Sequence, residues 1–307
     1  MSAHSVPTGT HACEICGAAQ SECTKNVYGY CEECELKIIG QSVNLGDNFA
    51  MKYFVEVYDK GLIDGKSLEM RFVFLGKTMT VEGVDLGAYY MFTIGGIAPE
   101  YMCENIDAYL LVDEEVAASK LSYSIKTNLT NLLARSTDEK LRSMICDTLA
   151  YGAEAQKYKE YKTGSLATDG VEGYEPSDRA PEKESEVEIS DSTAVAINSC
   201  EVVFGKINYL RFGLALEAKE GVTVRLGGLE MHLIKRGENE YVVLSSGIFL
   251  QDASEDLVLE IFQNGVSIAR ITTSIEAIAN ERAEEADGAL LIAIYNLGKT
   301  IQEYLIT

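Results

Sequence analysis

Two stretches of this 307-residue chain repeat one another at a long period, which constrains its fold more than any other feature. Ser-Tyr-Ser-Ile at 122–125 aligns with Thr-Thr-Ser-Ile at 272–275, an offset of 150 residues. Gly-Ala-Glu-Ala-Gln-Lys-Tyr at 152–158 aligns with Gly-Lys-Thr-Ile-Gln-Glu-Tyr at 298–304, an offset of 146. A four-residue deletion near 135–140 would reconcile the two offsets. Self-similarity at such a period indicates duplicated modules.

Both halves place strand patterns before a helical pattern. Alternating apolar residues predict strands, and Gly76-Lys77 and Asn264-Gly265 predict hairpin turns between them. Ser136 and Glu139 form a capping-box pattern that predicts a helix ending near Tyr161. The strands are expected at 49–57, 70–75, 78–81, 89–94, 109–112, 120–125, 202–204, 209–214, 222–226, 230–234, 241–244, 257–263 and 266–271, and a closing helix at 289–305. The fold class is therefore α+β, with mostly antiparallel sheets in two repeated β-rich modules, each closed by a C-terminal helix.

Gly152 and Gly298 share one slot of the repeat, inside each predicted terminal helix. Glycine within a helix costs about 1 kcal/mol relative to alanine. We therefore expect each helix to approach a sheet closely at this position.

Composition sets the boundaries of the modules. Residues 164–192 hold two prolines, three glycines and many acids, which predicts a flexible acidic linker; a long loop packed between domains is the alternative. The expected organisation is an N-terminal tail and zinc-ribbon-like segment at 1–41, a first module at 42–163, the linker at 164–192 and a second module at 193–307.

The cysteines near the N-terminus have the spacing of metal ligands. Cys13-x-x-Cys16 and Cys31-x-x-Cys34 form two knuckles that can complete a tetrahedral thiolate shell, so we expect a structural zinc ion. A pair of disulfides and a redox CxxC remain alternatives, and Cys23 is expected to be spare. The three other cysteines are expected to be buried small side chains: Cys103, Cys146 and Cys200.

Charge and missing motifs exclude several function classes. The net charge of −22 disfavours binding to nucleic acid, and no apolar stretch is long enough to insert into a membrane. The chain holds three histidines and no HExxH, GxSxG or GxGxxG motif, so we expect no enzymatic activity. Gly298-Lys299-Thr300 mimics the end of a P-loop but falls inside a predicted helix.

The 149–158 segment (LAYGAEAQKY) resembles the NYGAAAQ-Y-F-Y helix of modules in large secreted or surface-anchored proteins of gut Clostridia, within the Firmicutes. Residues 42–57 and 89–92 are similar to its LNLGDKIGINFYVDV strand pair and its YYVFTY strand. The second half resembles the companion module, whose KALYLYN-AA-AYF helix is only loosely matched at 289–305, and 13–17 resembles preceding CxxCG segments. This resemblance covers roughly residues 10–305. It implies an accessory extracellular role and supplies no catalytic residues.

These observations together predict a non-catalytic accessory or binding module of a bacterial secreted or cell-surface protein, with an unknown protein or glycan as partner. Residues 1–10 lack the apolar core of a signal peptide, so we expect a piece of a longer protein, with a cytoplasmic location as the alternative. The alternative functions are a carbohydrate-binding accessory domain and an intracellular zinc-ribbon adaptor. Four tyrosines are candidate ligand platforms, since tyrosine rings stack on sugars: Tyr89, Tyr90, Tyr158 and Tyr161.

Overall fold

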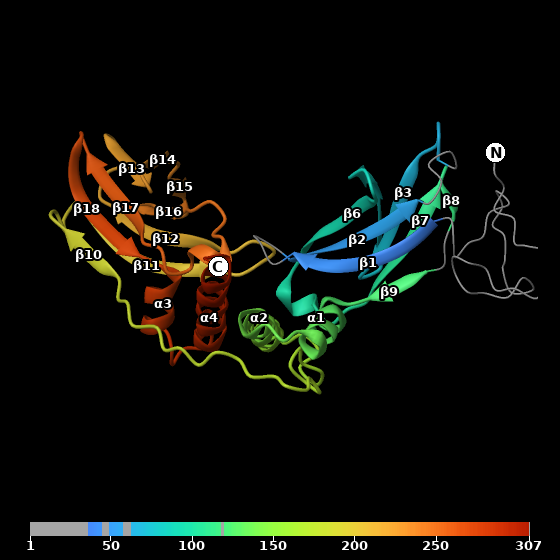
Figure 1. Cartoon of the computed structure of the whole chain (residues 1–307). Coiled ribbons are helices and arrows are strands. Elements are labelled where there is room, and N and C mark those ends of the chain that lie inside the picture. Colours follow the sequence, from blue (N-terminus) through green and yellow to red (C-terminus); the bar gives the residue numbers. More distant parts are fainter. Residues whose placement is uncertain (1–35, 45–48, 58–62, 118–119, 307) are drawn as a thin grey trace, which may run out of the picture. The chain divides into compact units, whose positions relative to one another are not determined.

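The computed structural model describes residues 36–44, 49–57, 63–117 and 120–306, and Figure 1 shows their helices and strands. The first half contains two antiparallel sheets. One has the strand order β1-β2-β6-β5, and the other has the order β4-β3-β7-β8 with β9 also paired to β7. Their bounds are β1 Leu36–Asn44, β2 Phe49–Val57, β3 Leu68–Phe74, β4 Lys77–Glu82, β5 Val84–Asp85, β6 Tyr90–Ile97, β7 Ile106–Val112, β8 Glu115–Val116 and β9 Leu121–Tyr123.

The two sheets of the first half pack face to face. Alternate residues of β2 and β3 are buried, and the rings of Tyr53 and Phe72 meet with centroids 5.3 Å apart. The β3–β4 hairpin turns at Leu75 and Gly76, both at positive φ. Two successive positive-φ residues match the right-handed twist of the flanking strands, as a type I′ turn requires. This half is therefore a β-sandwich.

The second half repeats the same strand order with one addition. Its sheets have the orders β11-β12-β16-β15 and β10-β18-β17-β13-β14, so each strand from β11 to β17 has its counterpart in β1 to β7. Their bounds are β10 Glu186–Ile189, β11 Val195–Val203, β12 Tyr209–Leu216, β13 Val222–Leu226, β14 Leu229–Met231, β15 Ile234–Lys235, β16 Glu240–Leu244, β17 Leu257–Gln263 and β18 Val266–Thr273. The hairpin predicted at Asn264-Gly265 is confirmed, with both residues at positive φ.

Small details of the backbone are repeated as well. The β1–β2 register shifts between Ile38 and Gly40, and the β11–β12 register shifts between Ile197 and Ser199, in each case after the third residue of the first strand. Ser124 and Ser274, aligned in the sequence, each accept a backbone N–H bond from the residue three positions on, at 3.0 Å, and so cap the helix that follows. Duplication of one module accounts for these coincidences.

The described residues form four α-helices, two after the last strand of each half: α1 Ile125–Arg135, α2 Glu139–Tyr158, α3 Ile275–Glu281 and α4 Gly288–Leu305. The 3-10 helices η2 Pro99–Tyr101 and η3 Leu250–Asp252 lie between sheet strands. α3 has 7 residues where α1 has 11, but α4 starts 13 residues after α3 starts (275 to 288), against 14 from α1 to α2 (125 to 139). Most of the change in offset between the halves therefore falls inside the long helices, before Gly152 and Gly298, and not near 135–140 as expected.

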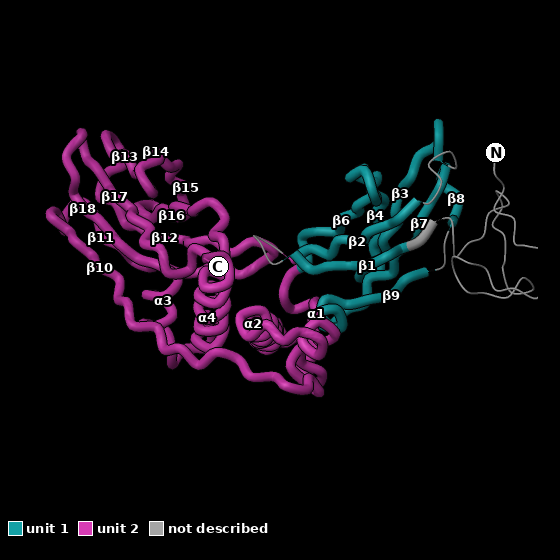
Figure 2. The backbone as a smooth tube through the Cα atoms, in the orientation of Figure 1, with its two compact units in different colours: residues 1–44, 50–97, 103–128 teal, residues 45–49, 98–102, 129–307 magenta. Residues whose placement is uncertain are grey.

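The chain divides into two compact units that do not follow the sequence halves (Figure 2). The first unit contains the described residues up to 44 together with 50–97 and 103–128, which make up nearly all of the first sandwich. The second contains 98–102 and everything described from 129 onward. It therefore holds the second sandwich and both long helices, α2 and α4, which pack against each other.

The two repeated glycines lie at close contacts inside the second unit. A Cβ on Gly152 would collide with the side chain of Met102, just after η2, and a Cβ on Gly298 would collide with the Leu250 carbonyl of η3. The predicted close approach exists, but each helix meets a 3-10 helix rather than a sheet.

A buried polar cluster joins α2 to α4. Asp147, only 1% exposed, accepts hydrogen bonds from the Ser177 N–H at 2.7 Å, from the Ser177 hydroxyl at 2.8 Å and from the Thr300 hydroxyl. Arg179 donates to the Thr300 hydroxyl at 2.8 Å and pairs with Glu303. The segment after α2 is thus tied across both helices.

Residues 164–192 differ from the flexible linker predicted from their composition. Ser177 and Arg179 bind the helix pair, Lys183 binds the Ser254 carbonyl at 2.6 Å, and residues 186–189 form β10 against β18. Their polar side chains form hydrogen bonds with the second unit. Because the segment has few apolar side chains to bury, these hydrogen bonds offset the entropy that is lost when it becomes ordered. The segment is a packed extension of the second unit.

Two predictions at the helices of the first half are wrong. The strand predicted at 120–125 ends at Tyr123, and α1, which was not predicted, begins at Ile125. The cap of α2 is Asp138, whose carboxylate accepts from the N–H groups of Lys140 and Leu141, whereas Ser136 accepts from the N–H of Asp138. Gly298 to Thr300 lie inside α4, as expected for a segment that is not a P-loop.

Candidate functional site

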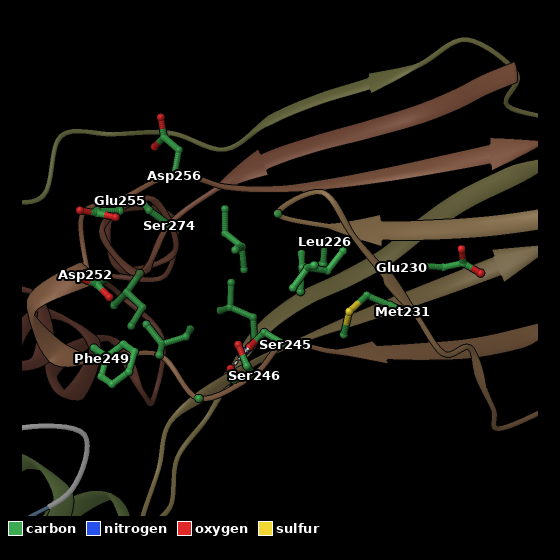
Figure 3. Close-up of a pocket in the computed structure, with 17 residues that line it drawn as sticks. Leu226, Glu230, Met231, Ser245, Ser246, Phe249, Asp252, Glu255, Asp256 and Ser274 are labelled. Carbon is green, nitrogen blue, oxygen red and sulfur yellow. Dashed lines mark hydrogen bonds between the residues drawn. The ribbon is translucent and has the colours of Figure 1, made fainter. Parts of the chain in front are cut away.

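A pocket of about 700 Å³ lies at one end of the second sandwich (Figure 3). Its volume falls within the range of small-ligand sites, about 300–1,000 Å³. The floor and walls come from β12, β13, β14, the segment after β16, and the start of β17 and α3. The apolar lining residues are Leu210, Leu226, Leu229, Met231, Ile248, Phe249, Leu257 and Ile275.

A break in one strand opens this space. β16 ends at Leu244, and the Ser245 hydroxyl then accepts the Leu210 N–H at 2.8 Å, taking the place of a backbone carbonyl. Pairing resumes at Ile248, whose N–H donates at 2.8 Å to the carbonyl of Asn208, the residue before β12, so Ser246 and Gly247 lie opposite one residue as a bulge. In the first half, the corresponding strand β6 continues without a break to Ile97.

A smaller side chain enlarges the same space. Leu226 pairs with the third residue of β17, Leu259, and Phe72 pairs with the third residue of β7, Ala108. Leu226 and Phe72 are therefore matched positions of the repeat. Phe72 is completely buried and packs on Tyr53, whereas Leu226 borders the pocket. The second half thus has leucine where the first half fills its sandwich with phenylalanine.

The charged side chains that line the pocket are all acidic. Asp252 is half-buried, and Glu255 and Asp256 are exposed on the segment between η3 and β17. Glu230 lines the pocket from β14 through its backbone and stem, with its carboxylate directed away (Figure 3). Asp256 is paired with Lys183 at 2.9 Å, which also fixes the rim through the Ser254 carbonyl. Carboxylates beside an apolar space favour a ligand that combines apolar surface with positive charge.

One wall of the pocket is the edge of a sheet. β14 is the last strand of its sheet in the described part of the chain, and its residue Leu229 is 73% exposed. Figure 3 shows Met231 pointing toward the pocket and the Glu230 carboxylate pointing away from it. Strand edges of this kind accept additional strands.

The four candidate tyrosines belong to different units. Tyr89 and Tyr90, both half-buried, lie in the first unit, and the ring of Tyr89 is edge-on to Phe54. Tyr158 and Tyr161 lie in the second unit, edge-on to Phe204 and Tyr101 respectively.

Lysine side chains lie over the rings of the second pair. The ammonium of Lys159 is 5.2 Å from the centroid of Tyr158, and that of Lys162 is 5.7 Å from the centroid of Tyr161. A sugar stacking on these ring faces would have to displace the lysines.

The predicted zinc ligands Cys13, Cys16, Cys31 and Cys34 lie outside the described residues, as does Cys23. Within the described ranges, no group of three or more His, Cys, Asp or Glu side chains is arranged to hold a metal ion.

The three remaining cysteines lie in the described part of the chain. Cys146 is buried, as predicted, whereas Cys103 and Cys200 are half-buried. Burial raises the pKa of the Cys200 thiol to about 12, so it remains protonated at neutral pH.

No protein-family model matches this chain, and no curated protein is significantly similar to it. The kinship with modules of clostridial surface proteins therefore stays a prediction. Among the residues that the structure describes, no helix has both the length and the apolarity needed to cross a membrane.

Sequence reasoning did not find the pocket. Its strongest local signal is Ser245-Ser246-Gly247, a turn-forming run directly after the strand predicted at 241–244. The acids at 252, 255 and 256 gave no signal of their own, because the chain contains 48 acidic residues.

Proposed function

We propose that this chain is a non-catalytic binding module whose ligand sits in the pocket of the second sandwich. The observation that carries the proposal is the break after β16, which leaves an apolar space of about 700 Å³ open beside a sheet edge. The lining combines apolar side chains with serine hydroxyls and carboxylates, and binding requires no further chemistry from them.

The sequence resemblance supports a setting for this module. It favours an accessory part of a bacterial secreted or cell-surface protein. In this setting the N-terminal segment would bind a structural zinc ion through Cys13, Cys16, Cys31 and Cys34. The net charge of −22 argues against nucleic acid as the partner, because like charges repel.

Glycan binding at the tyrosines has weaker support. A lysine ammonium lies over one face of Tyr158 and of Tyr161, which leaves less ring surface for a sugar, and the pocket contains one aromatic side chain, Phe249. An intracellular zinc-ribbon adaptor would use the N-terminal cysteines and would leave the pocket without a role.

The variant Leu226→Phe tests the proposal, because phenylalanine fills the matched position of the first half. Wild-type protein and L226F are compared on a random-peptide phage library and on a glycan array. The control is Val266→Phe, which adds an aromatic ring at an exposed position of the β17–β18 hairpin, where Val266 is 67% exposed.

We expect ligands that the wild type and V266F select and that L226F does not bind. The proposal fails if every ligand selected by the wild type also binds L226F. Loss of a glycan signal in Tyr89→Ala or Tyr161→Ala, with L226F unaffected, would transfer the binding role to the tyrosines.

A further inference from the structure

We propose that the ligand of the pocket is an extended, basic peptide segment that pairs with the outer edge of β14 and inserts one apolar side chain between the sheets. This inference rests on the proposed function and names its ligand class. Three features of the second unit carry it: the hydrogen-bonding direction of β14, the apolar side chains beside that strand, and the acidic rim opposite it.

The direction of the backbone groups of β14 follows from the ladder of β13. The N–H of Gly227 donates to the Val258 carbonyl of β17 at 2.9 Å. Because backbone groups alternate in direction along an antiparallel ladder, the N–H and C=O of Arg225, two residues earlier, also point toward β17. Glu230 is the partner of Arg225 in β14, so this is a non-hydrogen-bonded pair. The N–H and C=O of Glu230 therefore point outward, where a peptide backbone can bond to both.

Apolar side chains flank this backbone position. Leu229 and Met231, on either side of Glu230, pair with the buried Leu226 and Val224 and so lie on the inner face of the sheet. Phe249, 44% exposed, lies on the far side of the pocket. A peptide strand on β14 would place every second side chain on this inner face, within reach of the pocket.

The rim selects the charge of the peptide. Asp252 and Glu255 add negative charge across the pocket from β14, whereas the charge of Asp256 is balanced by Lys183. Lysine or arginine next to the inserted side chain would approach these carboxylates. An acidic segment would be repelled by them and by the net charge of the chain.

The test measures binding of synthetic peptides to the whole chain by fluorescence anisotropy. The probe alternates lysine with leucine, and its counterpart replaces every lysine with glutamate. The variants test the strand edge. Glu230→Pro removes the outward N–H but breaks no hydrogen bond between β13 and β14, and proline is tolerated at strand edges.

Glu230→Gln is the matched control, because it removes the same charge but keeps the N–H. Asp252→Asn combined with Glu255→Gln tests the rim.

We expect the lysine peptide to bind at least about tenfold more tightly than the glutamate peptide at low salt, with the difference shrinking near about 0.5 M salt. Glu230→Pro should weaken binding about three- to tenfold, and Glu230→Gln less than about twofold, as expected for one backbone hydrogen bond. Leu226→Phe should abolish binding, and the rim double variant should remove most of the preference for lysine.

Each other result has a definite reading. Binding that is lost in L226F but unchanged in E230P overturns strand pairing and leaves the pocket as a ligand site. Equal binding of both peptides at low salt overturns the basic ligand class. If circular dichroism shows that E230P is unfolded, lysine peptides N-methylated at single backbone nitrogens replace that variant. Strand pairing is overturned if none of these methylated peptides binds more weakly than the parent.

Discussion

Asp147 of α2 accepts a hydrogen bond from the hydroxyl of Thr300 of α4, so one buried carboxylate joins the terminal helices of the two repeated halves. The same carboxylate holds the segment after α2 through the N–H and hydroxyl of Ser177. Asp147 therefore contributes both to the packing of the two helices and to the position of the segment around Ser177.

The substitution Asp147→Ala should destabilise the second unit by about 3 kcal/mol. It leaves the Ser177 N–H without its acceptor and empties a buried carboxylate site, whereas the Thr300 hydroxyl keeps the Asn296 carbonyl at 3.0 Å as an acceptor. Urea unfolding followed by circular dichroism measures the loss, and amide hydrogen exchange at Ser177 should accelerate. The control Asp178→Ala, at an exposed neighbouring position, should stay within about 0.5 kcal/mol of the wild type. Unchanged exchange at Ser177 in D147A would contradict the role given to Asp147.

Alanine at the two repeated glycines should have unequal costs. At Gly298 the new methyl meets the Leu250 carbonyl, which is backbone, and the Cβ of Ala253 at 2.8 Å, so we expect a loss of about 2–3 kcal/mol. At Gly152 the methyl meets Met102, a flexible side chain that can move. The higher helix propensity of alanine there offsets about 1 kcal/mol of the cost of displacing Met102, so the net loss of stability should be smaller than at Gly298. Thermal unfolding ranks the two variants. Gly164→Ala, at a position with open space, is the control, and equal losses at 152 and 298 would refute the argument.

The Tyr151 hydroxyl should make stability fall at alkaline pH. It accepts a hydrogen bond from the Asn208 side chain at 3.0 Å, and burial raises its pKa to about 12 from an ordinary value of 10. The folded state therefore retains a proton that the unfolded state has lost between these pH values. The contribution of the Tyr151 hydroxyl to the free energy of unfolding is complete below about pH 10. Roughly 2–3 kcal/mol of it is lost as the pH rises through 12.

Denaturant unfolding at several pH values between 8 and 12 measures this slope. In Tyr151→Phe the fall above pH 10 should be smaller than in the wild type, although this variant begins about 1 kcal/mol less stable because Asn208 loses its acceptor. Tyr158→Phe, at a tyrosine that is 41% exposed, should keep the wild-type slope. Parallel slopes for all three proteins would show that Tyr151 does not titrate in this range.

The N-terminal cysteines should bind one zinc ion per chain. Metal analysis of protein purified without added chelator should find zinc together with four protected thiolates, since a closed tetrahedral site needs all four. Cys13→Ser and Cys31→Ser should each lose the metal, whereas Cys23→Ser should retain it. Metal-free protein with oxidised cysteines would favour the disulfide alternative.

The elements with a clear period were predictable from the sequence. The strand expected at 257–263 has those bounds in the structure, and the helix expected at 289–305 begins one residue earlier. Segments with weak local signals were missed. α1 contains two threonines and two asparagines, which are poor helix formers, and it is stabilised by its Ser124 cap. β10 exists because β18 offers an edge, a tertiary effect that composition does not show.

The candidate site was beyond sequence reasoning for a related reason. The pocket results from the end of β16 at Leu244 and from a leucine at position 226 where the first half has a phenylalanine. It is thus a space that side chains fill in the first sandwich and do not fill in the second. Such a gap becomes visible only once the two halves can be aligned by their strand registers, with Leu226 matched to Phe72.

The pairing of α2 with α4 has a consequence for how the chain can be divided. A fragment that ends at residue 163 would contain α2 but lack the helix that covers it, and a fragment that begins at 193 would contain α4 with the surface toward α2 bare. Each fragment should therefore aggregate or recruit a second molecule through that surface, and the two fragments expressed together should recombine into one complex. The duplicated copies have become mutually dependent, so expression boundaries belong outside both helices.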